Sequence, residues 1–391
     1  MTLHPPPTPL HVSRTPWSRR SFLATASLAL AGCGRPASVL SPAPPSQEFE
    51  GPASLRQHAA QHNLLYGCAV NVPRLTSDPA YAALVVAQSS ILVAENAMKW
   101  GPLRPTPTSF NFDQADALIA FAEENHIKLR GHNLVWHMQL PAWFAGYANA
   151  ANADQLLLNH IEQVAGRYAG RMHSWDVVNE AVQVTDGRPD GLRATPWLQL
   201  LGAGYIETAF RAARRADPQA LLTYNDYGIE GEDPASQRKR DAVLLLLRRL
   251  KTRDVPLDAM GIQSHISAGP RHVYGAGLLR FLADVRQLGL EVFLTELDVN
   301  DRDLPADVAT RDEAVAATYQ RYLDLVLAEP AVRAVLTWGI TDRYTWLNGE
   351  NARADHLPER CLPFDNAYVP TDAFFAIRNS FDHRAALRTK L

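Results

Sequence analysis

Apolar and polar positions follow a repeating order along most of the chain, with short apolar runs separated by longer stretches of helical spacing. A short apolar run bounded by turn residues predicts a buried strand, and apolar residues three or four positions apart predict an amphipathic helix. The strand pattern occurs at residues 64–71, 90–94, 128–136, 174–179, 221–227, 259–264, 292–297 and 334–339. Helical spacing fills the intervals, for example at 206–215, 237–250 and 313–327.

Eight alternations of strand and helix predict an α/β protein, specifically a (β/α)₈ TIM barrel. A doubly wound open sheet is the alternative fold. That fold usually carries a glycine-rich phosphate loop after its first strand, and the sequence Gly67-Cys68-Ala69 is not such a loop. The length of 391 residues accommodates one barrel preceded by a leader.

The first fifty residues differ in composition from the rest. An arginine pair, Arg19-Arg20, precedes an apolar run at 22–31 that is too short to span a bilayer, and this order is typical of a twin-arginine export signal. The sequence Leu30-Ala31-Gly32-Cys33 resembles a bacterial lipobox, in which the cysteine becomes lipidated. Ordinary cleavage nearby, with Cys33 incidental, is the alternative.

These features predict three segments. Residues 1–32 form the signal peptide, residues 33–53 form a Pro/Ser/Ala-rich tether, and residues 54–391 form the catalytic barrel. The expected location is therefore outside the cytoplasm, either as a lipoprotein of the cell envelope or as a secreted protein.

Charge and cysteine content exclude several classes of partner. The chain has 38 basic and 41 acidic residues and a net charge of −3, so nothing attracts nucleic acid or an anionic membrane surface. A lipid anchor would be the one contact with a membrane. The three cysteines form neither a disulfide framework nor a metal-ligand cluster, and we expect no metal and no cofactor. We expect a monomer.

Polar and aromatic residues gather where the predicted strands end. In a (β/α)₈ barrel the chemistry takes place at the carboxyl ends of the strands. Charged residues at so many strand ends would be costly unless they served a site. In chain order these residues are Glu95, Asn96, Lys99, His132, Trp136, Gln139, Asn179, Glu180, Tyr227, Gln263, His265, Glu296, Asp298, Trp338 and Trp346.

Two of these residues are glutamates at strand ends, and a pair of carboxyl groups is what glycoside cleavage requires. Glu180 ends the fourth predicted strand and Glu296 ends the seventh, so a closed barrel can bring them face to face. One carboxyl group protonates the leaving oxygen, and the other attacks the anomeric carbon or activates water. Asn179 beside Glu180 offers an amide to a sugar hydroxyl. A lone glutamate at a strand end would more often form a salt bridge at the barrel mouth.

The motifs at these strand ends resemble those of glycoside hydrolase family 10, the xylanase family, in order from about residue 60 to residue 380. WDVVNE at 175–180 looks like the acid/base motif of the family, and TELD at 295–298 looks like its nucleophile motif. Further similar motifs are ENAMKW at 95–100, RGHNLVWH at 130–137, YNDY at 224–227, GIQSH at 261–265 and TWGITD at 337–342.

The resemblance implies a retaining endo-β-1,4-xylanase with Glu180 as acid/base and Glu296 as nucleophile. His265 would hydrogen-bond Glu296, Asp298 would orient His265, and Trp338 and Trp346 would roof the site. Tyr227 would serve the leaving-group side. The remaining sugar contacts implied are Glu95, Asn96, Lys99, His132, Trp136, Gln139, Asn179 and Gln263, and the substrate would be xylan or xylo-oligosaccharides.

Two other functions compete with this interpretation. The first is a β-1,4-glucanase or mixed-specificity glycosidase on the same barrel, which crowding by Trp338 and Trp346 would disfavour because glucose carries a C6 hydroxymethyl group that xylose lacks. The second is a non-catalytic xylan-binding lipoprotein, which would need neither glutamate. A retaining enzyme should hold the two carboxyl groups about 5–5.5 Å apart. Asp176 is expected to make a structural pair.

Overall fold

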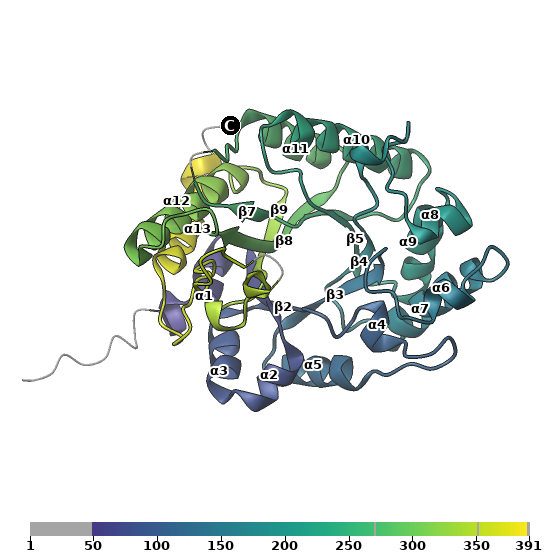
Figure 1. Cartoon of the computed structure of the whole chain (residues 1–391), viewed down its shortest axis with the longest axis horizontal. Helices are drawn as coiled ribbons and strands as arrows, with labels where there is room; N and C mark the ends of the chain where they lie inside the picture. Colours follow the sequence, from purple (N-terminus) through teal and green to yellow (C-terminus); the bar gives the residue numbers. More distant parts are fainter. Residues whose placement is uncertain (1–48, 270, 350–351, 389–391) are drawn as a thin grey trace, which may run out of the picture. The chain divides into compact units, whose positions relative to one another are not determined.

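The computed structural model describes residues 49–269, 271–349 and 352–388, and its strands form a closed parallel barrel surrounded by helices (Figure 1). The sheet order is β6-β5-β4-β3-β2-β1-β9-β8-β7, and an additional pairing of β6 with β8 closes the ring. The barrel strands are β1 Leu65–Val70, β2 Ile91–Ala94, β3 Lys128–Val135, β4 Ser174–Asn179, β5 Leu221–Asp226, β6 Ala259–Ile262, β8 Glu291–Asn300 and β9 Val332–Thr337. The predicted (β/α)₈ barrel is confirmed, since each predicted strand overlaps one of these.

Helices follow the strands and cover the outside of the ring. The longer ones are α3 Pro79–Gln88, α5 Asp113–Glu124, α7 Ala153–Arg167, α9 Tyr205–Ala216, α10 Pro234–Thr252, α11 Ala276–Gln287, α12 Val308–Val326 and α13 Asp372–Arg388. Short ones are α1 Leu55–Gln61, α2 Val72–Ser77, α4 Trp100–Leu103, α6 Phe144–Tyr147 and α8 Pro196–Leu201, with 3₁₀ turns η1 Gly51–Ala53, η2 Val184–Asp186, η3 Asp342–Tyr344 and η4 Trp346–Asn348. The predicted helical stretches 206–215 and 237–250 lie in α9 and α10, and the stretch 313–327 lies in α12 except for its last residue.

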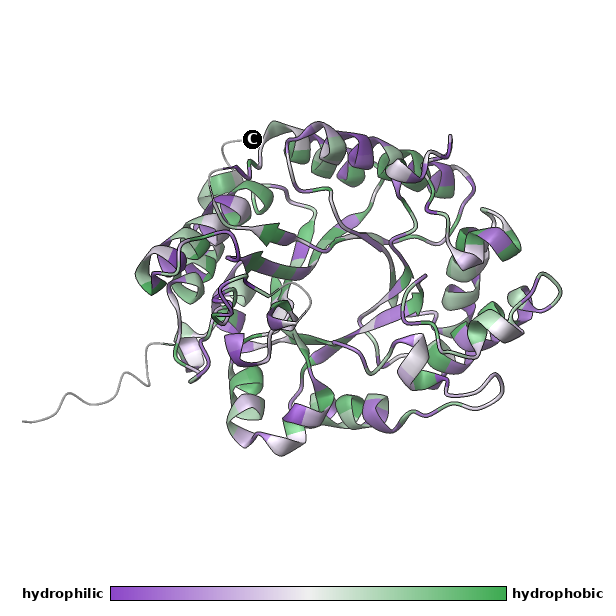
Figure 2. Ribbon diagram, viewed as in Figure 1, coloured by the Kyte–Doolittle hydropathy of each residue, from purple (hydrophilic) through white to green (hydrophobic). Residues whose placement is uncertain are grey.

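The helix α9 shows why these segments take up this position. Ile206, Ala209, Phe210 and Ala213 recur at three- and four-residue intervals and are buried against the barrel. Arg214 lies in the last turn, where a cation interacts favourably with the helix dipole. Figure 2 shows the resulting distribution, in which apolar residues dominate the strands and polar residues are frequent on the helices.

The barrel interior holds its own small apolar cluster, distinct from the larger core between strands and helices. Phe293 lies in this cluster together with Ile91, Val93 and Leu336, and Trp338 is its member just beyond the end of β9. The interior is therefore filled with side chains, as is usual for this fold, and the space available for a ligand lies at the strand ends.

The structure differs from the sequence prediction at one side of the rim. The predicted strand 259–264 is interrupted, because β6 ends at Ile262 and Ser264 has a left-handed backbone with φ of 64°. A separate strand, β7 (His265–Ser267), then pairs with β8, which runs to Asn300 rather than ending at residue 297. The pairing of His265 with Asp298 extends this side of the barrel beyond the ring.

At the amino-terminal side, the predicted tether 33–53 overlaps the described residues only at its end. There Phe49 packs edge-on against Phe364 and Phe374, with ring centroids 5.6 and 6.3 Å away. The predicted signal peptide and Cys33 lie outside the described residues. Within the described part of the chain, no helix combines the length and the apolar character needed to cross a membrane.

Candidate active site

The two candidate glutamates belong to one hydrogen-bond network, although they lie far apart in the chain. Asn225, at the end of β5, donates from Nδ2 to Oε1 of Glu296 at 2.7 Å and to Oδ1 of Asn179 at 3.0 Å. Gln263 donates from Nε2 to Oε1 of Glu180 at 3.0 Å. Three strand ends thus connect the two carboxyl groups through side-chain amides. Asn225 was not among the predicted site residues, although its position at a strand end within the YNDY motif could have indicated it.

Glu180 sits directly after β4 in a left-handed conformation, with φ of 56°. Such a backbone costs a non-glycine residue about 1–3 kcal/mol and persists where surrounding contacts enforce it. Its N–H donates to the carbonyl of Asn225 at 2.9 Å, and only 8% of the residue is exposed. Burial raises the pKa of Glu180, although the hydrogen bond from Gln263 acts in the opposite direction. The environment therefore favours the protonated acid.

Glu296 lies within β8 and is 5% exposed, yet its environment favours the opposite charge state. Burial alone raises the pKa of a carboxyl group. The imidazoles of His132 and His265 and the amide of Asn225 outweigh burial and lower the pKa of Glu296 to about 2. Glu296 is therefore a carboxylate at any ordinary pH, while Glu180 beside it tends toward the neutral form.

Two histidine–aspartate pairs flank Glu296. His265 lies with Nε2 3.3 Å from Oε2 of Glu296 and with Nδ1 3.0 Å from Oδ1 of Asp298. Burial opposes a charge on His265, but Asp298 and Glu296 together raise its pKa to about 10. The predicted chain from Asp298 through His265 to Glu296 is present in the structure.

The second pair is formed by His132 and Asp176. Nδ1 of His132 lies 2.9 Å from Oδ2 of Asp176 and 4.0 Å from Oε1 of Glu296. Arg130 donates to the other oxygen of Asp176. Asp176 therefore makes the structural pair that we expected, with Arg130, and it also orients the imidazole of His132 beside the candidate nucleophile Glu296.

On one side of the two glutamates, Lys99 is the centre of a group of residues predicted to contact the sugar. Its Nζ donates to Oδ1 of Asn96 at 3.1 Å and lies over the rings of Trp136 and Trp338, 5.2 and 5.8 Å from their centroids. Burial lowers the pKa of Lys99, opposed first by the charge of Glu296. These groups offer an ammonium, an amide and two aromatic faces to a hydroxylated ring.

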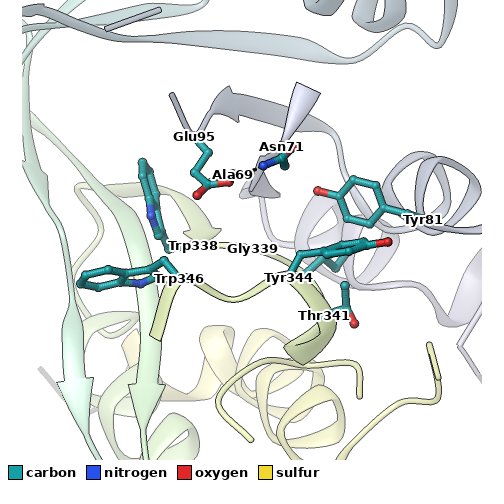
Figure 3. Close-up of a pocket in the computed structure, with 10 residues that line it drawn as sticks. Ala69, Asn71, Tyr81, Glu95, Trp338, Gly339, Thr341, Tyr344 and Trp346 are labelled. Atoms are coloured by element: carbon teal, nitrogen blue, oxygen red, sulfur yellow. Dashed lines mark hydrogen bonds between the residues drawn. The ribbon is translucent and has the colours of Figure 1, made fainter. Parts of the chain in front are cut away.

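The tryptophans expected to roof the site lie together beside Glu95 (Figure 3). Trp338 is 7% exposed, whereas Trp346, at the start of η4, is 39% exposed. The Nε1 of Trp346 donates to Oδ2 of Asp298 at 2.8 Å, so Asp298 holds both this ring and His265. Burial raises the pKa of Glu95, which accepts a hydrogen bond from Asn71 at 3.4 Å.

Tyr227 lies on the opposite side, where it lines a hollow of about 380 Å³. Its hydroxyl accepts a hydrogen bond from Arg193 at 2.9 Å. Gln139 is exposed at the rim with φ of 50°, and its side chain has no hydrogen-bond partner in the part of the chain that the structure describes. The structure thus brings most predicted residues into one network and leaves Gln139 at its periphery. Among the described residues, no group of histidine, cysteine, aspartate and glutamate could hold a metal ion.

A barrel whose carboxyl mouth holds one ionised and one protonation-prone glutamate, surrounded by amides and indoles, has the composition of a glycoside hydrolase. Residues 54–380 match glycosyl hydrolase family 10, and the chain belongs to that family.

Named relatives support this assignment. Endo-1,4-beta-xylanase B of Thermotoga neapolitana is 33% identical over 333 residues, covering 84% of this chain and 92% of that protein. Thermostable celloxylanase of Thermoclostridium stercorarium is 37% identical over 317 residues, covering 74% and 78%. The crystal structure of xylanase 10B from Thermotoga petrophila RKU-1, in complex with xylobiose, has a TM-score of 0.77 at 34% identity, covering 85% of this chain and 98% of that one.

Proposed function

We propose that this protein is a retaining endo-β-1,4-xylanase, which hydrolyses internal bonds of xylan by double displacement. One observation carries the proposal. Within a single network, Glu296 is held as a carboxylate by two imidazoles and an amide, while burial favours a proton on Glu180. That separation of charge states is what a nucleophile and a general acid require.

In the first step, Glu296 attacks the anomeric carbon and Glu180 gives its proton to the leaving oxygen. The bond between sugar and leaving group breaks as the bond between sugar and Glu296 forms. Asn179, held by Asn225, presents an amide next to Glu180, where a sugar hydroxyl can accept a hydrogen bond that strengthens as positive charge develops on the ring.

In the second step, Glu180 acts as a base. Once Glu296 is esterified it carries no charge, so the repulsion that adds to the effect of burial on the pKa of Glu180 disappears and this pKa falls. Glu180, which has lost its proton to the departing chain, can then remove a proton from water, and that water releases the sugar with retained configuration. The expected separation of about 5–5.5 Å between the carboxyl groups remains a prediction of this mechanism.

The support for xylan comes from the roof and from the relatives. Trp338 and Trp346 crowd the space beside Glu95, where a hydroxymethyl group would add bulk. Several relatives are named as xylanases, and one solved neighbour contains xylobiose. A mixed xylanase and glucanase activity is the second candidate, because one relative is named a celloxylanase. A purely sugar-binding role would leave the two opposed glutamates without use.

One pair of measurements tests the proposal. We expect the protein to release reducing sugars from xylan much faster than from carboxymethylcellulose. We also expect the β-anomer to form first when the products are followed by NMR. Comparable rates on both polymers would favour the mixed-specificity enzyme. A first product of inverted configuration would contradict the roles of Glu180 and Glu296, and no release from either polymer would overturn the enzymatic function.

We further propose that the protein is exported as a monomeric lipoprotein. The order of Arg19-Arg20, the apolar run at 22–31 and Cys33 supports this location. An enzyme for a polymer too large to enter the cell needs to act outside the cytoplasm, and a Pro-rich tether would hold the barrel away from the membrane.

A further inference from the structure

Arg193 connects the peptide of the candidate acid/base to the leaving-group side of the cleft. Its Nε donates to the backbone carbonyl of Glu180 at 2.8 Å, and its Nη2 donates to the hydroxyl of Tyr227 at 2.9 Å. The guanidinium carbon also lies 5.6 Å from the centre of the Tyr227 ring. One side chain thus contacts both groups that the departing part of the substrate would meet.

The contact with Glu180 fixes a backbone that needs support. Glu180 has φ of 56°, and its N–H is held by the carbonyl of Asn225. Arg193 holds the carbonyl on the other side of the same residue, with a charged donor. Charge-assisted hydrogen bonds are about twice as strong as neutral ones, so this contact is well suited to maintaining a strained conformation.

Arg193 is itself fastened to the strand end. The backbone N–H of Arg193 donates to the carbonyl of Ala181 at 2.7 Å, and Val182 forms an antiparallel bridge with Leu192. The segment that follows β4 therefore leaves the barrel and returns to pair with itself. This return places the guanidinium in a fixed position relative to the end of β4.

We propose that Arg193 is a positioning residue, which holds the carboxyl group of Glu180 in register with a leaving group bound at Tyr227. The inference rests on the proposed glycosidase function. Proton transfer to the leaving oxygen depends on the donor being within hydrogen-bond reach of it, and a misplacement of about 1 Å can lower a rate by about 100-fold.

The test compares leaving groups of different acidity. We expect Arg193→Met to lower kcat for an aryl xylobioside with a poor leaving group by about 10- to 100-fold. For a dinitrophenyl xylobioside, whose departure needs no proton, kcat/KM should fall by less than about threefold, because kcat/KM reports the first step and not the later hydrolysis that uses Glu180 as base. The slope of log kcat/KM against the pKa of the leaving group should become steeper, and for the poor leaving group the loss should fall in kcat rather than in KM.

The chain provides a matched control in the same segment. Arg188 is exposed and pairs with Asp190, so Arg188→Met makes the same chemical change away from Glu180 and should leave the slope unchanged. Arg193→Lys keeps the charge and can reach one of the two acceptors, and we expect it to give an intermediate slope. This milder variant also keeps the test valid if Arg193→Met does not fold.

The outcomes separate the two hypotheses. Equal losses of kcat/KM on good and poor leaving groups in both Arg193 variants, with wild-type enzyme active, would show a general structural role and overturn only the positioning role. A wild-type protein inactive on both aryl xylobiosides would overturn the proposed function, and this inference with it.

Discussion

The imidazole of His265 lies between two carboxylates, with its Nε2 3.3 Å from Oε2 of Glu296 and its Nδ1 3.0 Å from Asp298. Asp298 and Glu296 together outweigh burial and raise the pKa of His265 to about 10, and His132 and His265 together outweigh burial and lower the pKa of Glu296 to about 2. The nucleophile is therefore kept charged by a cation that contacts it directly and is held in place from behind.

This relationship predicts how activity depends on pH. His265→Gln retains a hydrogen-bond donor and removes the positive charge, so the pKa of Glu296 should rise and the acid limb of kcat/KM should move to higher pH. The measurement is the pH profile of kcat/KM on an aryl xylobioside. His58→Gln, which alters a pair with Asp382 on the outside of the barrel, serves as the control. Acid limbs that coincide in wild type and His265→Gln would contradict the pairing.

The same pair predicts a window of stability. The pKa of Glu296 lies below its ordinary 4.5, so the ionised carboxylate contributes fully to the free energy of unfolding above pH 4.5. This contribution is lost as the pH falls toward 2. The pKa of His265 lies above its ordinary 6.5, so the protonated imidazole contributes fully to the free energy of unfolding below pH 6.5. This contribution is lost as the pH rises toward 10. Thermal denaturation across this range should show that His265→Gln loses most stability between pH 4.5 and 6.5, and a loss that does not vary with pH would exclude the charge pair as its cause.

The two glutamates should respond differently to removal. Glu296→Ala should lose nearly all activity on every substrate, because no intermediate can form. Glu180→Ala should still react with substrates that carry very good leaving groups, accumulate the covalent intermediate, and recover turnover when azide supplies a nucleophile that needs no base. A burst followed by a slow phase, measured in rapid-mixing experiments, would identify Glu180. Azide rescue of Glu296→Ala with retained configuration would reverse the assignment.

Trp346 should contribute to the choice between xylose and glucose. Trp346→Ala opens the roof and removes its hydrogen bond to Asp298, so it should narrow the preference for xylose by about 1–3 kcal/mol, the range for one such contact in a pocket. The comparison is kcat/KM on aryl xylobioside against aryl cellobioside. Trp346→Phe, which keeps an aromatic wall, should retain most of the preference, and an unchanged ratio in Trp346→Ala would remove Trp346 from the roof.

A stability prediction concerns Gly131 in β3. A methyl group on Gly131 would lie 1.9 Å from the ring of Trp175, which is fully buried. Gly131→Ala should therefore lower the free energy of unfolding by about 1–3 kcal/mol or more, as overpacking does. Gly166→Ala in α7, where the added carbon meets nothing within 4 Å, should be neutral or stabilising in the same denaturation experiment. Equal stability of the two variants would contradict the packing.

The last prediction concerns the leader. Cys33→Ser should release the protein from membranes, because Cys33 is the residue that the lipobox predicts to carry the acyl chains, while Ala37→Ser in the tether should leave it bound. A single acyl chain binds only marginally, so the anchor expected is the several chains typical of bacterial lipoproteins. Fractionation and mass spectrometry of the mature amino terminus provide the measurement. Wild-type protein that is soluble and begins elsewhere than Cys33 would contradict the proposal.

The sequence was sufficient to predict the barrel, because its apolar runs fall in strands and its polar residues fall at strand ends. It was not sufficient for contacts that depend on how strands face one another. Asn225 bridges the two sides of the site only because β4, β5 and β8 converge, and Arg193 reaches Glu180 only because the segment after β4 returns to it. No spacing in the chain encodes either contact.

The short strand β7 was missed for a related reason. His265–Ser267 is a brief segment, and its pairing with β8 depends on the break at Ser264. A signal did exist, since Leu297, the last residue of the predicted strand, and Val299, beyond it, alternate with polar residues and both are buried. The period-two alternation could have extended that strand to Asn300.

The extra ladder between β7 and β8 gives the two walls of the cleft different mechanical properties. His265 and Asp298 are registered partners in hydrogen-bonded strands, whereas Trp346 belongs to a 3₁₀ turn between loops. Loops tolerate insertion and exchange far better than paired strands do. Grafting a new segment over 342–349 therefore offers a route to altered sugar preference. The new segment should keep a hydrogen-bond donor to Asp298 in place of Trp346, because Asp298 also holds His265 against Glu296.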